Sequence, residues 1–338
     1  MSASQPDSHD AAVSTTQLRK WFRNGREKVE AVSGIDLTVH PGEIFGFLGP
    51  NGAGKTTTLR MLTTLLPIDA GEAFVAGVDV RREPQEVRRR IGYVGQLGGT
   101  DLPATGRENL VLQGSLYGAS RGEAERRAAE LIDSLELSGF ADRIARTYSG
   151  GQRRRLEVAL GIMHRPDVLF LDEPTTGLDP QNRANLWEQL RALRGAGTTI
   201  FLTTHYLEEA DTLADRVAIV DHGKVVAEGT PQDLKKRLAG DVVSVRPRPG
   251  GQLIEELQRD LAGLPFVTEA RLEGETIRLY VTDGAQALPL VFDRLRNAGV
   301  QLDSVSVAEP SLDDVFLQQT GRSLRDTGPD GAAKEVAA

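Results

Sequence analysis

The sequence predicts an α/β protein that continues into a smaller α+β unit, and two patterns carry this prediction. Before residue 240, short apolar runs at 43–48, 168–171 and 198–203 each end in glycine or polar residues. Such runs are typical of buried parallel strands, beyond whose carboxyl ends ligands bind. After residue 240, strand-like and helix-like segments follow one another as β-α-β-β-α-β, which is the ferredoxin-like order.

The composition is that of an ordinary globular protein of about two domains. Of the 338 residues, 39% are hydrophobic and 26% are charged, and the formal net charge is −8. This acidic balance gives no general electrostatic case for nucleic-acid binding, so no nucleic-acid partner is expected. The sequence contains no cysteine, which excludes disulfides and thiolate metal sites.

We expect neither a membrane span nor a secretion signal. No apolar run approaches the roughly 18 residues that a membrane helix needs. Residues 1–12 are polar and acidic and lack the apolar core of a signal peptide. The protein should therefore be cytosolic or reach a membrane through a partner. The ends at 1–14 and 323–338 are predicted to be disordered tails around two domains, at 15–240 and 241–322.

A phosphate-binding loop follows the first apolar run. It consists of Gly49, Pro50, Asn51, Gly52, Ala53, Gly54, Lys55 and Thr56, and matches G-x-x-x-x-G-K-T. Its glycines let the backbone aim N–H groups at a phosphate, and a helix predicted to begin at Thr57 adds its positive end. Lys55 can reach the β- and γ-phosphates, and the Thr56 hydroxyl can hold Mg²⁺. An ordinary glycine-rich turn would need neither residue, so the loop predicts nucleoside triphosphate binding.

Two acids follow the second apolar run. Asp172 ends a predicted strand beside the phosphate-binding loop, where P-loop enzymes place the carboxylate associated with Mg²⁺. Glu173 comes next and can polarise an attacking water. The alternative is a pair of solvated acids at a strand end. Four preceding apolar residues and the following Pro174 weaken this alternative.

Gln96, His205 and two aromatic residues are weaker candidates when each is taken alone. Gln96 follows a predicted strand and could complete a Mg²⁺ shell or orient water, although an ordinary polar residue is the simpler interpretation. His205 follows the third apolar run, at the edge where ligands bind in open α/β sheets. Trp21 or Phe22 could stack on a purine, but core packing is the more frequent role of such rings.

A second arrangement for an anion begins at Tyr148. Ser149, Gly150, Gly151 and Gln152 open a predicted helix, whose first N–H groups, hydroxyl and dipole favour a negative group. A plain capped helix start is the alternative. A turn at 177–180, which contains Asp179, leads into a further helix.

Together these residues resemble the ATP-binding subunit of ABC transporters over residues 15–240. The motifs stand in the family's order: Walker A at 49–56, Gln96, the signature at 148–152, Walker B at 168–172, the D-loop at 177–179 and the switch histidine His205. The signature begins with Tyr148, where leucine is commoner in the family. The resemblance implies ATP and Mg²⁺ as ligands, Glu173 as the catalytic base and His205 as a contact to the γ-phosphate. It places the adenine-stacking aromatic at Trp21 or Phe22, and we favour Phe22.

The resemblance also implies partners. Two such domains face each other head to tail, so that ATP lies between the Lys55 loop of one and the Ser149–Gly151 segment of the other. Transport would require separate integral-membrane permease subunits, which the family contacts through the stretch corresponding to 98–107. The closing segment 309–317 is similar to daunorubicin-resistance-type subunits, which belong to ABC-2 exporters of drugs or lipids. We therefore expect an ATPase that powers export of a drug, antibiotic or lipid-like substrate at the cytoplasmic face of the cell membrane.

Two other functions stay open at this point. A soluble ABC ATPase of DNA repair or translation is disfavoured by the acidic composition, the single nucleotide domain and the lack of a coiled-coil or zinc insertion before the signature. An importer ATPase fits the core motifs, but the closing segment favours export. The C-terminal domain carries no catalytic constellation, so we expect it to support assembly or regulation.

Overall fold

The computed structural model describes residues 11–25, 27–96, 98–238, 240–248 and 254–323, and the predicted tails lie largely outside these ranges. The chain divides into two compact units between Thr230 and Pro231. This division precedes the expected boundary at 240, because helix α8 (Pro231–Lys236) packs against helix α11 (Leu312–Thr320) of the second unit. Within the described ranges, no helix is long and apolar enough to cross a membrane.

The first unit is built on a six-stranded sheet in the order β10-β9-β3-β8-β7-β6. Its strands are β3 (Ile44–Leu48), β6 (Ile91–Val94), β7 (Val168–Asp172), β8 (Thr199–Thr204), β9 (Arg216–Asp221) and β10 (Lys224–Gly229). All neighbours are parallel except β9 and β10, which form an antiparallel hairpin. Every residue of β3, β7 and β8 is buried, as the apolar runs predicted. Groups that must meet a ligand therefore lie at the ends of these strands.

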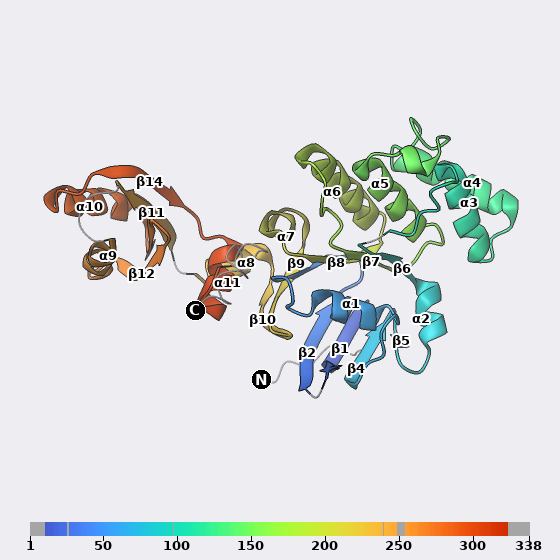
Figure 1. The fold of residues 1–338 in the computed structure, drawn as a ribbon, viewed down its shortest axis with the longest axis horizontal. Coiled ribbons are helices and arrows are strands. Elements are labelled where there is room, and N and C mark those ends of the chain that lie inside the picture. The colour runs from blue at the N-terminus through green and yellow to red at the C-terminus, as the bar shows by residue number, and fades with distance from the viewer. Residues whose placement is uncertain (1–10, 26, 97, 239, 249–253, 324–338) are drawn as a thin grey trace. The chain divides into compact units, whose positions relative to one another are not determined.

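A four-stranded antiparallel sheet, in the order β2-β1-β4-β5, covers one side of the first unit. Its strands are β1 (Val13–Asn24), β2 (Glu27–Val39), β4 (Ala70–Val75) and β5 (Val78–Asp79). Helix α1 (Lys55–Leu62) lies between the two sheets, and Leu59, Met61 and Leu62 pack in one core with side chains of both (Figure 1). The predicted tail at 1–14 is corrected at its end: Val13 is fully buried and pairs with Val39 and Val75.

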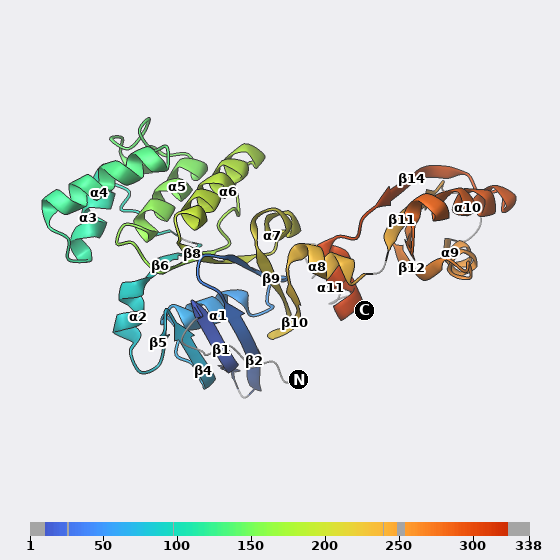
Figure 2. The ribbon, with the colours of Figure 1, turned by 180° about the vertical axis from the view of Figure 1, so that it is seen from behind.

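The opposite side of the central sheet carries a helical subdomain. Its main helices are α3 (Gly106–Leu116), α4 (Arg121–Ser134), α5 (Gly150–Gly161) and α6 (Pro180–Gly195), while α2 (Pro84–Arg90) and α7 (Leu207–Leu213) flank the sheet (Figure 2). Capping boxes begin three of them, at Thr105, Ser120 and Ser149. In each box a side chain and its partner three residues later satisfy N–H groups that the helix leaves free. These residues therefore fix where α3, α4 and α5 start.

The second unit contains the predicted ferredoxin-like order. Its elements are β11 (Asp241–Pro247), α9 (Ile254–Ala262), β12 (Val267–Glu273), β13 (Thr276–Val281), α10 (Gly284–Asn297) and β14 (Leu302–Ala308). The strands form an antiparallel sheet in the order β12-β13-β11-β14. Alternate side chains such as Val243, Val245 and Leu279 pack on one face against Leu257 of α9 and Val291 of α10.

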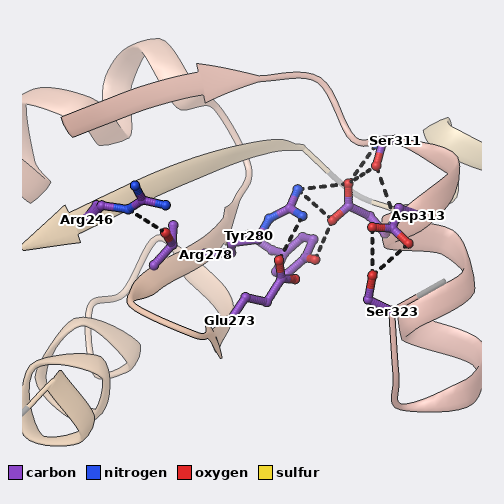
Figure 3. A network of polar contacts seen from close by, with 9 residues as sticks. Arg246, Glu273, Arg278, Tyr280, Ser311, Asp313 and Ser323 are labelled. Atoms are coloured by element: carbon purple, nitrogen blue, oxygen red, sulfur yellow. Dashed lines mark hydrogen bonds and ion pairs between the residues drawn. The ribbon is translucent and has the colours of Figure 1, made fainter. Parts of the chain in front are cut away.

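The start of α11 is attached to β13 by a buried polar network (Figure 3). Asp314 accepts a hydrogen bond of 2.6 Å from the Tyr280 hydroxyl and lies 2.8 Å from the Arg278 guanidinium. Its other oxygen accepts from the backbone and hydroxyl of Ser311, which caps the helix. Burial, reinforced by the neighbouring Asp314, raises the pKa of Tyr280 far above its usual value. The phenol therefore stays protonated and acts as a donor.

We predict that Asp314→Ala lowers the free energy of unfolding of the second unit by about 2–4 kcal/mol, since it removes the acceptor of the Tyr280 hydroxyl and leaves Arg278 with Glu273 as its carboxylate partner. Both tryptophans lie in the first unit, so amide hydrogen exchange in β13 and α11 is the suitable measurement.

Asp293→Ala is the matched control, because Asp293 pairs with Arg296 on the exposed side of α10. This change should cost no more than about 0.5 kcal/mol. Equal losses in both variants would show that the buried network does not hold α11.

Candidate active site

The phosphate-binding loop joins β3 to α1, which begins at Lys55. Two of its glycines have no room for a side chain. A Cβ on Gly49 would come within 2.3 Å of the Val220 carbonyl oxygen, and one on Gly54 within 2.4 Å of the Ala31 carbonyl oxygen. Gly54 also has a φ of 97°, a conformation that favours glycine. The loop can therefore follow its tight path only with glycine at these positions.

Lys55 places a cation inside this loop. Its side chain is buried, and its ammonium donates to the carbonyl oxygens of Gly49 (2.8 Å) and Pro50 (3.0 Å). The ammonium also lies 3.5 Å from a carboxylate oxygen of Glu173. Burial lowers the pKa of Lys55, while the charge of Glu173 opposes that shift. The positive charge is thus available where the motif predicts the phosphates.

Asp172 and Thr56 form a site suited to a divalent cation. The Thr56 hydroxyl lies 3.1 Å from Oδ1 of Asp172, which also accepts a 2.6 Å hydrogen bond from the Thr203 hydroxyl. The second carboxylate oxygen, Oδ2, is buried and has no hydrogen-bond partner among the described residues. Carboxylate and hydroxyl oxygens are ligands that Mg²⁺ accepts, with water and phosphate oxygens completing its shell. The donor set fits Mg²⁺, which would offset charge on the phosphates.

Glu173 stands directly after β7 in a strained backbone conformation, with a φ of 46°. Its N–H donates to the carbonyl and hydroxyl oxygens of Thr203, at 3.1 and 3.0 Å. Nδ1 of His205 lies 3.3 Å from its carboxylate. The neighbouring His205 and then Lys55 hold the pKa of Glu173 below its usual value, against the effect of burial. The carboxylate is therefore ionised at neutral pH and can accept a proton.

Three of the other predicted residues lie apart from this cluster. Gln96 is exposed, two residues after β6. Ser149 caps α5 and Asp179 caps α6, and the two helix starts meet where Gly151 packs against Asn182. Ser149 and Gly150 are exposed, and in the described ranges no hydrogen bond or ion pair joins the Ser149–Gln152 segment to Lys55 or Glu173. The predicted capped helix start is present, with Ser149 and Gly150 exposed at its surface.

The two candidate aromatics are not core residues. Phe22 is 42% exposed, and the Lys20 ammonium lies 5.7 Å from the centre of its ring. Trp21 is half-buried beneath the Lys28 ammonium, which lies 3.6 Å from its ring centre. The stacking role of Phe22 stays a prediction, and its ring has an exposed surface on which a base could lie.

Thr203 was missed by sequence reasoning. It pairs with Asp172 across β8 and β7, and its hydroxyl contacts both acids. The available signal was a threonine near the carboxyl end of a buried strand. That signal becomes specific only when the neighbouring strand and its register are known.

Comparison with known proteins agrees with this geometry. A family model described as ABC transporter matches residues 32–176, and one described as ATP-binding protein DrrA1-3-like, C-terminal domain, matches residues 229–320. The daunorubicin/doxorubicin resistance ATP-binding protein DrrA of Streptomyces peucetius is 47% identical over 325 residues, which cover 96% of this chain and 97% of that protein. The chain belongs to the ABC transporter ATP-binding proteins.

Two further similarities support this membership. The Nod factor export ATP-binding protein I of Cupriavidus metallidurans is 41% identical to this ABC subunit, over 87% of this chain and 94% of that protein. The solved dimer of the ATP-binding cassette MJ0796, in a post-hydrolysis state with ADP and Pi, has a TM-score of 0.60 and 27% identity. The structural match covers 64% of this chain and 98% of the MJ0796 chain. The predicted fold and ATPase class are therefore confirmed.

We predict that Glu173→Gln keeps ATP binding nearly intact and lowers kcat by about 100-fold or more, because an amide cannot accept the proton of the attacking water. ATP affinity and steady-state hydrolysis of the purified full chain check this prediction.

Thr176→Ala is a control in the same turn, since the Thr176 hydroxyl donates a 3.3 Å hydrogen bond to Oε2 of Glu173, whereas Lys55 and His205 lie beside Oε1. It should change kcat far less than Glu173→Gln. Wild-type hydrolysis by Glu173→Gln would exclude Glu173 as the base.

Proposed function

We propose that this ABC subunit hydrolyses ATP to power export of a drug, antibiotic or lipid-like substrate through separate membrane permeases of the ABC-2 type. The similarity to the daunorubicin/doxorubicin resistance subunit carries the proposal, because it extends over both units of the chain. The similarity to a Nod factor export subunit favours export over import without fixing the cargo. The subunit would act peripherally at the cytoplasmic face of the cell membrane.

In this proposal two copies share each ATP. Lys55 and the loop amides of one copy would bind the phosphates, and Thr56, Asp172 and Gln96 would bind or surround Mg²⁺. The exposed Ser149–Gly151 helix start of the second copy would contribute N–H donors to the same γ-phosphate. The dimeric cassette among the solved relatives supports this pairing. Glu173 would take a proton from the attacking water, beside His205.

The permease would dock near α3, which begins within the 98–107 stretch. Leu112 and Leu116 lie one turn apart on this helix and are 51% and 72% exposed. Leu102 and Tyr117 are also exposed. Large apolar side chains that gather on a surface mark interaction sites. This apolar surface of α3 supports a contact with an apolar membrane subunit.

We predict that the ABC subunit co-purifies from membranes with its permease and that an exported cargo stimulates ATP hydrolysis by that complex. Leu116→Asp should remove the subunit from the membrane fraction, because a charge on α3 would be desolvated in the contact. Immunodetection of the subunit in washed membranes and ATPase assays of the complex give both readouts.

Leu290→Asp is the matched control, because Leu290 is 50% exposed but lies on α10 of the second unit. It should leave membrane association unchanged. Retention of Leu116→Asp at the wild-type level would argue against docking at α3, and a complex that no candidate cargo stimulates would argue against export.

The shared site is tested by mixing two variants. A carboxylate at the signature should repel the γ-phosphate and block pairing, and Gly150→Asp suits this purpose because a Cβ there enters open space, whereas one on Gly151 would strike Asn182. Gly150→Asp and Lys55→Ala should each be inactive alone. Their mixture should recover part of the ATPase activity, since one composite site then contains an intact loop and an intact signature.

Exchange of differently tagged subunits is the control for this mixture. Gly150→Asp should still bind ATP at its own loop. Normal hydrolysis by Gly150→Asp as a strict monomer would exclude the shared site.

A further inference from the structure

Arg154 on α5 is a buried arginine that the motifs do not assign. Its Nε donates to the carbonyl oxygen of Pro174 at 2.8 Å, and its Nη2 donates to that of Asp172 at 3.1 Å. Its Nη1 donates to the carbonyl oxygen of Gly95 at 2.8 Å and to a carboxylate oxygen of Glu157 at 3.0 Å. The guanidinium thus bonds the carbonyl groups of Asp172 and Pro174, the residues before and after Glu173.

These two bonds fall where the backbone is strained. Glu173 has a positive φ, which a non-glycine residue keeps only when its surroundings hold it there. Thr203 holds its N–H from one side, and Arg154 holds the preceding and following carbonyls. Because the direction of the side chain follows from the backbone, these contacts aim the carboxylate toward Lys55 and His205.

The same arginine also holds the loop that contains Gln96. Arg154 bonds the carbonyl of Gly95, immediately before Gln96. Its partner Glu157 is buried, and a Cβ on Gly98 would come within 2.1 Å of its carboxylate. The Arg154–Glu157 ion pair therefore contacts this loop at Gly95 and at Gly98, on both sides of Gln96.

We propose that Arg154 is a positioning residue for ATP hydrolysis, which orients Glu173 and connects it to the Gln96 loop. A displacement of that loop then changes the hydrogen bonds that hold Glu173. Arginine suits this role because its planar fork donates in several fixed directions, whereas a lysine ammonium is a point charge. The link from a docked permease to hydrolysis rests on the proposed function; the positioning of Glu173 does not.

A double-mutant cycle in the full chain tests the positioning. Arg154→Met should lower kcat by at least about tenfold, because the carboxylate is no longer aimed. The Kd for ATP should stay within about twofold, since Arg154 bonds no residue of the 49–56 loop. In the Glu173→Gln background, Arg154→Met should then cost less than about threefold further, against at least about tenfold in the wild type. If the two losses multiply, Arg154 acts only through general stability and the proposal is overturned.

Arg155→Met is the matched control on the same helix. Arg155 lies over the Phe140 ring and donates to the Glu136 carbonyl, away from Glu173. Whatever loss it causes should multiply with that of Glu173→Gln. If Arg154→Met does not fold, the cycle uses Arg154→Lys, which keeps the charge but cannot bond three separated carbonyls. Combined with Glu173→Gln, this variant must also lose less activity than the product of the two single losses. Wild-type kcat in either Arg154 variant overturns the proposal.

The connection to the Gln96 loop has its own test. Gly98→Ala pushes a methyl group against Glu157 and should lower kcat without weakening ATP binding. Its effect should largely disappear in the Arg154→Met background, and full multiplication of the two losses would overturn the connection. All these measurements use the purified ABC subunit without a permease or cargo. Their results can therefore be interpreted even if the export proposal is wrong.

Discussion

The hydroxyl of Thr203 orients both acids of the site. It donates to Asp172 Oδ1 at 2.6 Å and accepts from the backbone N–H of Glu173 at 3.0 Å. This contact requires β7 and β8 to be parallel neighbours in one register, with Asp172 opposite Thr203. The register in turn depends on strands that are buried along their whole length. The packing of the sheet therefore places both Asp172 and Glu173, the two candidate acids of the site.

The helical subdomain meets this edge of the sheet through α5. One end of α5 presents the exposed Ser149 cap, and less than two turns later the buried Arg154 bonds the backbone around Glu173. One helix thus connects the exposed Ser149 cap with the turn that contains Glu173. Because Arg154 also bonds Gly95, the Gln96 loop belongs to the same connected structure. The Ser149 cap and the Gln96 loop are therefore both connected, through α5 and Arg154, to the backbone around Glu173.

The motifs and strand ends could be predicted because each is contained in one short stretch of sequence. The glycine-rich loop before Lys55 and the acid after four apolar residues are examples. The three carbonyl bonds of Arg154 and the strained backbone at Glu173 could not be predicted. They depend on segments that only the tertiary fold brings together. The same limit explains the ends of the first domain. Val13 is held by distant strands, and α8 is assigned to the second unit by α11.

The 3.5 Å contact between Nζ of Lys55 and Oε1 of Glu173 has a consequence for the basicity of that carboxylate. His205 and then Lys55 hold the pKa of Glu173 below its usual value, so this carboxylate holds a proton weakly while both groups lie beside it. If the Lys55 ammonium binds nucleotide phosphates, its electrostatic interaction with the Glu173 carboxylate becomes weaker. Any weakening of the contact between Lys55 and Glu173 would raise the proton affinity of the Glu173 carboxylate. The ammonium that the motif assigns to the phosphates is thus also a neighbour of the Glu173 carboxylate, so phosphate binding and the basicity of Glu173 are coupled through Lys55.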